Sequence, residues 1–260
     1  MQWKNAQRFD ARMHRFAAEA YARCVDWFGP PDDPQRPYQL ICSRMMGLQG
    51  NHCVYNWLLH CYGLFIAHDE RFEEICSSIG HEMSHRVTMC RPGLHKQPWI
   101  NETLAHLVSA WFLHEQGYAD YVRTLEAFYV KQPGQVDITQ FKTTQKRRGI
   151  LVGLRNEQYP PEFAQWTWRL AMALSILLPS QYLCRLVGAA SLNAWVEALP
   201  SEYHPPVCHL LELPDAPAFP ESAPLYHAYG RAMEILGKTA EARAAYEHSL
   251  LLEPDEAGKL

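Results

Sequence analysis

Apolar residues recur along the chain with two different periods, and the two periods divide it into helical and strand-like segments. Helical spacing covers residues 5–28, 72–87, 99–130, 160–178 and 191–199. Short β-like runs cover residues 38–46, 53–57 and 62–67. The pattern predicts an α+β fold, with a small sheet placed before most of the helices. We expect the run at 62–67 to be an edge strand that could pair with an extended peptide, or else a simple buried strand.

Glycine and proline mark the ends of these segments. Gly29-Pro30-Pro31 ends the first helix, residues 131–134 break the long helical region, and Pro160-Pro161 opens the apolar helix that follows. Residues 135–158 are polar and poorly periodic. The Pro-rich interval 201–222 is typical of a wrapping linker. We therefore predict a domain over residues 1–200, a linker over 201–222 and a tail over 223–256.

The tail resembles a single tetratricopeptide repeat, which is a helical hairpin. The consensus positions are occupied by Tyr226, Gly230, Met233, Gly237, Ala242, Tyr246, Ser249 and Pro254. One such unit cannot bury its apolar face alone. It is expected to dock on the upstream domain, or else to bind a protein partner or a second copy of the chain.

The segment His81-Glu82-Met83-Ser84-His85 reads H-E-x-x-H. Residues four apart lie on one face of a helix, so both imidazoles can bind one Zn²⁺ while the glutamate between them acts as a general base. At about 100° per residue, the two histidines fall nearly opposite the apolar stripe of their own helix. The sequence thus predicts a zinc-binding helix with one buried face, and a surface helix with two solvated histidines is the alternative.

Glu102 is the predicted third ligand. It lies opposite the apolar stripe of the next predicted helix, and sixteen residues separate it from His85, enough for a loop and a return. A catalytic zinc ion usually has three protein ligands and keeps one position open for water. Two histidines and one glutamate form one of the known ligand sets.

H-E-x-x-H followed by a glutamate on the next helix resembles the gluzincin branch of zinc metallopeptidases. The form P-W-I-x-E-x-L-A around Glu102 is similar to the P-x-W-L-x-E-G-L-A signature of the peptidase MA-like group, and the specific part covers residues 72–113. The resemblance implies a zincin-like fold and one Zn²⁺ bound by His81, His85 and Glu102, with Glu82 as catalytic base. Thr103 departs from the glycine of this signature, and His106 stands where relatives often carry an acid.

Two more residues are candidates around this site. His106 lies one helical turn after Glu102 and is the best partner for a ligand histidine, because ligand imidazoles normally bond a second group through their other nitrogen. Other histidines of this region, among them His114, are expected at the surface. Tyr159 is a candidate hydrogen-bond donor to an oxyanion.

Composition and charge indicate the cellular compartment and the kinds of partner that we expect. A net charge of −4 provides no basic surface for nucleic acid. The most apolar run, 170–178, is too short to cross a bilayer, and residues 1–5 contain no secretory signal. The eight cysteines include no C-x-x-C pair, which favours buried reduced thiols over a disulfide framework. We therefore expect a cytoplasmic protein that acts on a protein or peptide substrate, without nucleic acid or membrane as partners.

The sequence favours a zinc metallopeptidase and leaves two other functions open. One is a non-catalytic zinc-binding adaptor that acts through the repeat-like tail. The other is a zinc hydrolase of non-peptide amides, because the same machinery serves both reactions. Glu82 favours an enzyme over the adaptor, since a purely structural zinc site needs no base beside its ligands.

Overall fold

The computed structural model describes residues 10–42, 52–56, 61–66, 71–88, 93, 97–131, 134–143, 147–151, 154–158 and 161–252. It is mostly helical with small sheets, which confirms the α+β class. The chain forms two compact units, each assembled from separated stretches of sequence. The first comprises residues 1–92, 104–124 and 150–156, and the second comprises residues 93–103, 125–149 and 157–260. Some unit boundaries fall within continuous elements, namely helices α3 (Pro98–Glu115) and α4 (Ala119–Val130) and strands β4 (Arg147–Leu151) and β5 (Leu154–Gln158).

Helix α1 (Ala11–Phe28) opens the first unit. The Asp10 side chain caps its start by accepting a hydrogen bond from the Met13 amide at 2.9 Å. Gly29 ends it with φ 81°, a conformation that favours glycine, and donates its amide to the Val25 carbonyl. One apolar stripe is buried: Met13, Phe16, Ala17, Ala20, Cys24 and Phe28. The predicted helix and its stop are therefore confirmed within the described residues.

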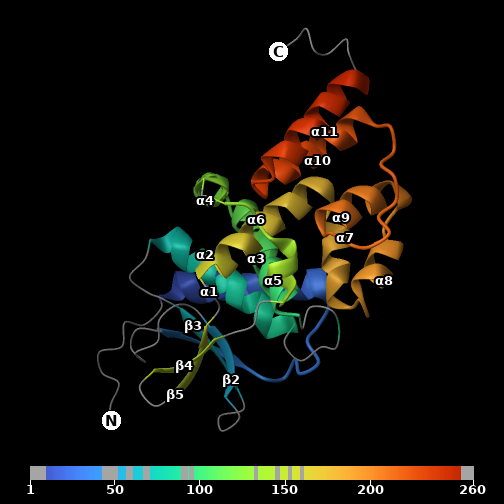
Figure 1. The fold of residues 1–260 in the computed structure, drawn as a ribbon. Helices are drawn as coiled ribbons and strands as arrows, with labels where there is room; N and C mark the ends of the chain where they lie inside the picture. Colours follow the sequence, from blue (N-terminus) through green and yellow to red (C-terminus); the bar gives the residue numbers. More distant parts are fainter. Residues whose placement is uncertain are drawn as a thin grey trace, which may run out of the picture. The chain divides into compact units, whose positions relative to one another are not determined.

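The three predicted strands form one mixed sheet in the order β1–β3–β2 (Figure 1). The strands are β1 (Tyr38–Cys42), β2 (His52–Asn56) and β3 (Cys61–Ile66). β3 pairs in parallel with β1 and antiparallel with β2. Of the two alternatives for residues 62–67, the edge strand is wrong and the buried strand is right, because β3 is the central strand. Five of its six residues are buried, and a continuous apolar run is typical of such a strand.

Helices α2 (Phe72–Thr88), α3 (Pro98–Glu115) and α4 (Ala119–Val130) follow the sheet. α2 packs on α1, β2 and β3. The predicted helical region at 99–130 is two helices, because Gly117 adopts φ 86° and the chain turns there.

Between α4 and the tail, the described residues form α5 (Ile138–Thr143), β4 (Arg147–Leu151), β5 (Leu154–Gln158), α6 (Pro161–Leu177), α7 (Ser180–Cys184), η3 (Arg185–Val187), α8 (Leu192–Glu197), η4 (Ser201–Tyr203) and α9 (His204–Leu210). Residues 150–156, which include parts of β4 and β5, belong to the first unit, and the other elements of this series belong to the second. Part of the predicted linker at 201–222 is helical, and Pro205 and Pro206 are buried at the start of α9. Proline fits the first helical turn, where its missing N–H needs no partner.

The tail is a helical hairpin of α10 (Ala223–Ile235) and α11 (Thr239–Leu252), and it packs on α6 within the second unit (Figure 1). The Arg169 guanidinium on α6 donates to the carbonyls of Ile235 and Gly134. Gly237 turns the chain with φ 76°, and a Cβ there would lie 2.7 Å from the Gly134 carbonyl oxygen. The hairpin thus docks on its own chain.

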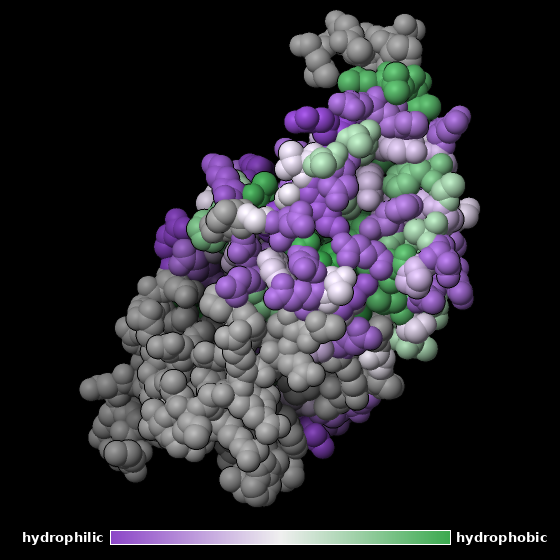
Figure 2. Space-filling model, in the orientation of Figure 1, coloured by the Kyte–Doolittle hydropathy of each residue, from purple (hydrophilic) through white to green (hydrophobic). Residues whose placement is uncertain are grey.

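Deleting residues 223–260 is expected to lower the melting temperature. Met233 and Leu236 are buried, and each such side chain contributes about 1.5–3 kcal/mol to folding. Leu251→Ala is the matched control, because Leu251 is 77% exposed and its loss should change little. Figure 2 shows apolar surface at the C-terminal end of α11. Equal melting temperatures for the truncated and full chains would show that packing of the hairpin on α6 does not stabilise the protein.

Several cysteines are buried thiols, as the cysteine spacing favours. Cys61, Cys76 and Cys208 are buried and free, and burial raises the pKa of Cys76 to about 12. Among the described residues, no helix is long and apolar enough to cross a membrane.

Candidate metal centre

Helix α2 is buried on more than one side. Glu73 and Glu74 lie in its first turn, where the helix dipole favours acids. From Ile79 onward every described residue except His81 is buried, and His85 is 8% exposed. The single apolar stripe of α2 predicts that the two histidines lie on an open face. That expectation is wrong, because His85 is buried and His81 is partly buried.

Helix α3 covers part of the histidine side of α2. The Ser109 hydroxyl donates to the Ser77 carbonyl at 2.8 Å, and the two serine hydroxyls lie 3.1 Å apart. One helical turn after Ser77, the centre of the His81 ring lies 4.6 Å from the centre of the His106 ring. Glu102 precedes His106 by one turn, so the two side chains lie on the same face of α3.

The three predicted ligands converge. The Nε2 atoms of His81 and His85 lie 3.1 Å apart, with the two rings nearly perpendicular. One ligand atom from each of His81, His85 and Glu102 lies within 4.8 Å of the others. Among the described residues, these three form the group of metal-ligating side chains that could hold an ion.

The donor set fits zinc. Two nitrogens at 2.0–2.1 Å from one tetrahedral zinc ion lie about 3.3 Å apart, close to the distance between the two Nε2 atoms. The set combines two imidazoles with a carboxylate, and three protein ligands leave a fourth position open. His81 and Glu102 are only partly buried, so the group is not sealed from solvent.

Glu82 lies between the two histidines in sequence and is 3% exposed. It is outside the group of converging ligand atoms. A buried carboxylate is unusual, because burial disfavours its ionised form, and this one lies next in sequence to a predicted ligand, His81. Its place matches that of the base in the H-E-x-x-H motif.

The other candidates have different outcomes. His106 lies against His81, as its spacing from Glu102 predicts. His114 is exposed in the last turn of α3. Tyr159 lies outside the described residues, so its predicted role stays a prediction.

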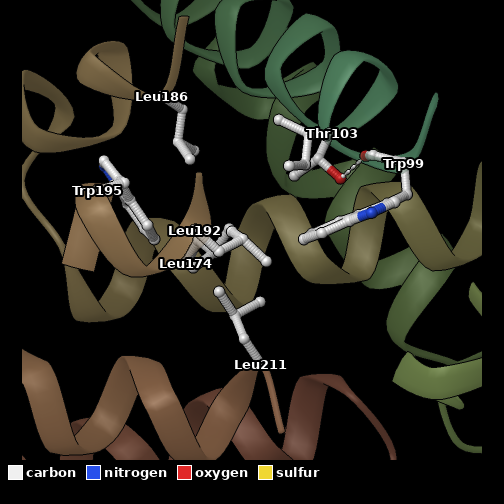
Figure 3. Close-up of a pocket in the computed structure, with 8 residues that line it drawn as sticks. Trp99, Thr103, Leu174, Leu186, Leu192, Trp195 and Leu211 are labelled. Atoms are coloured by element: carbon white, nitrogen blue, oxygen red, sulfur yellow. Dashed lines mark hydrogen bonds between the residues drawn. The ribbon is translucent and has the colours of Figure 1, made fainter. Parts of the chain in front are cut away.

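The start of α3 is anchored by apolar contacts on another of its faces. Trp99, Ile100 and Thr103 line an apolar hollow of about 240 Å³, part of it open to solvent, together with Leu174, Leu186, Leu192, Trp195 and Leu211 (Figure 3). The Thr103 hydroxyl donates to the Trp99 carbonyl at 2.6 Å and is thereby satisfied. Thr103, which departs from the expected glycine, therefore packs and bonds within the helix that carries Glu102.

A buried ion pair beside the site was not predicted. The Arg86 side chain is 0% exposed and pairs with Asp33 at 3.0 Å. It also donates to the carbonyls of Asp33 and Arg36, and its guanidinium lies 4.0 Å from the centre of the Tyr62 ring. Position 86 falls seven residues after Ile79 on the apolar stripe, which indicates that Arg86 is buried but does not identify Asp33 as its partner. Arg86 fixes the end of α2 directly after His85.

Comparison of the chain with protein-family models, with curated proteins and with solved structures finds no match.

Proposed function

We propose that this protein is a zinc-dependent metallopeptidase in which His81, His85 and Glu102 hold one zinc ion. The convergence of these three side chains carries the proposal, because their ligand atoms lie within 4.8 Å although they come from separate helices. The proposal includes a zincin-like fold. It is supported by a small mixed sheet that precedes the helix bearing H-E-x-x-H, with helices after it.

Bound zinc would supply a Lewis acid, which lowers the pKa of water and polarises a carbonyl group. Glu82 is the base that takes a proton from the attacking water and returns it to the leaving amine. His81 and His85 present Nε2 to the ion, and Glu102 adds a negative charge. His106 packs on the ring of His81 and limits its rotation.

A peptide substrate is favoured over an adaptor role by two observations. Glu82 is a buried carboxylate that a purely structural zinc site does not need. The hairpin that an adaptor would use for binding packs on α6 of its own chain. Among the described strands, β1 and β2 lie on the outside of their sheet, so either could pair with an extended peptide.

The reaction is tested with a mixture of peptides and the full chain. The protein is stripped with a chelator, and one portion is reloaded with one equivalent of zinc. We expect the reloaded protein alone to cleave peptides, with new termini identified by mass spectrometry. Tight zinc binding without cleavage of any peptide would contradict the proposal and favour the adaptor. Cleavage of small acylated amines but not of peptides would favour the non-peptide amide hydrolase.

A further inference from the structure

Gly80 lies at a point of close approach between α2 and α3, directly before His81. A Cβ built on Gly80 would lie 3.3 Å from the Cα of Ser109 and 3.7 Å from its Cβ and Oγ. The nearest atom belongs to the backbone of α3, so no change of rotamer can relieve the contact. A side chain at position 80 would therefore displace α3 by a few tenths of an ångström.

Two hydrogen bonds hold the helices together at the same level. The Ser109 hydroxyl donates to the Ser77 carbonyl at 2.8 Å and lies 3.1 Å from the Ser77 hydroxyl. Ser109 is 1% exposed, so these bonds are shielded from water. Ser109 follows Glu102 by seven residues, which is two turns of the same helix. A shift at Ser109 is therefore carried along α3 to Glu102.

We propose that Gly80 is a positioning residue for the metal centre. Its missing side chain lets α3 approach α2 closely enough for Glu102 to reach the ion held by His81 and His85. Ser77 and Ser109 fix this approach along the helix axis. The inference rests on the proposed zinc site and extends it to a residue that touches neither the ion nor a substrate. Metal sites need such support, because their ligands must be held within about 0.5 Å of the productive geometry, and a shift of a few tenths of an ångström uses much of that tolerance.

The test is the zinc affinity of Gly80→Ala in the full chain, measured by competition with a chelator. Alanine is the better helix former by about 1 kcal/mol, which offsets part of the cost of displacing α3, so the metal-free protein is expected to remain folded. The zinc Kd is expected to rise about tenfold or more, as when a supporting contact of a metal site is lost. Bound Co²⁺ should also change its visible absorption, which reports ligand geometry.

Two other glycines provide controls. Gly188→Ala adds a Cβ with no atom within 4 Å and should change neither property. Gly230→Ala on α10 brings a Cβ to 2.7 Å from the Tyr246 ring, so it should lower the melting temperature and leave zinc affinity unchanged. Wild-type zinc affinity in Gly80→Ala would overturn the inference. So would an equal loss of affinity in Gly230→Ala.

Ser109→Ala tests the same contact if Gly80→Ala fails to fold. It removes both hydrogen bonds without adding bulk, and unchanged zinc affinity would then overturn the inference. A wild-type chain that binds zinc but cleaves nothing would contradict the proposed reaction, while the affinity difference at Gly80 would still support the positioning role. A wild-type chain that binds no zinc would overturn both.

Discussion

Glu82→Gln is expected to abolish peptide hydrolysis and to leave zinc bound. Glutamine is nearly isosteric with glutamate but cannot accept the proton of the attacking water, and a general base contributes about 10²–10⁴-fold to the rate. Glu82 is 3% exposed and outside the converging ligand group, so the ligands and the packing should persist. The measurements are kcat for a cleaved peptide and the zinc content of the variant.

Glu73→Gln is the control for charge on the same helix. Glu73 lies in the first turn of α2, and the variant should hydrolyse at the wild-type rate. A Glu82→Gln protein that retains both zinc and full activity would show that another group takes the proton. Loss of zinc together with activity would mean that Glu82 supports the ligands instead.

Arg86→Ala is expected to lower the free energy of unfolding by about 3–5 kcal/mol, the usual effect of breaking a buried ion pair. Its side chain is fully buried and that of Asp33 is 13% exposed. The carbonyls of Asp33 and Arg36 also lose a donor. Urea denaturation of the variant and of the wild type gives the difference directly.

Arg23→Ala separates burial from the mere presence of an ion pair. Arg23 bonds Glu115 through two contacts of 2.7 Å, shorter than the Arg86–Asp33 contact. The side chains of Arg23 and Glu115 are each more than a third exposed, and such exposed ion pairs contribute about 0–1 kcal/mol to the free energy of unfolding. Arg23→Ala should therefore change stability little. Equal losses of unfolding free energy in the two variants would contradict the stabilising role of the buried Arg86–Asp33 ion pair.

The convergence of the candidate metal ligands was largely predictable from local spacing. H-E-x-x-H places two imidazoles on one helix face whatever the surroundings, and Glu102 with His106 repeats this spacing on α3. The contact between the two helices was not predictable, because it depends on Gly80, Ser77 and Ser109, which carry no chemical signature. The Arg86–Asp33 pair joins residues 53 apart in sequence, and no periodicity reports such a pair.

The fold was predictable at the level of its elements and less so at the level of their arrangement. Alternation and apolar runs located β1, β2 and β3, yet strand order depends on pairing between distant residues, so the pattern alone left β3 open between an edge strand and a buried strand. Gly117 turned one predicted helix into two, because a single glycine does not interrupt the apolar period around it. Within the predicted linker at 201–222, Pro205 and Pro206 lie in the first turn of α9, because proline fits the start of a helix as well as a loop.

Zinc content per chain is the most direct measurement of the central claim. The wild-type protein, loaded with zinc and passed through a desalting column, should retain one zinc ion, and His85→Ala should retain none under the same conditions. His114→Ala is the matched control, because His114 is exposed on α3 and should not affect the metal. A wild-type chain without zinc, or a His85→Ala chain that retains it, would contradict the site formed by His81, His85 and Glu102.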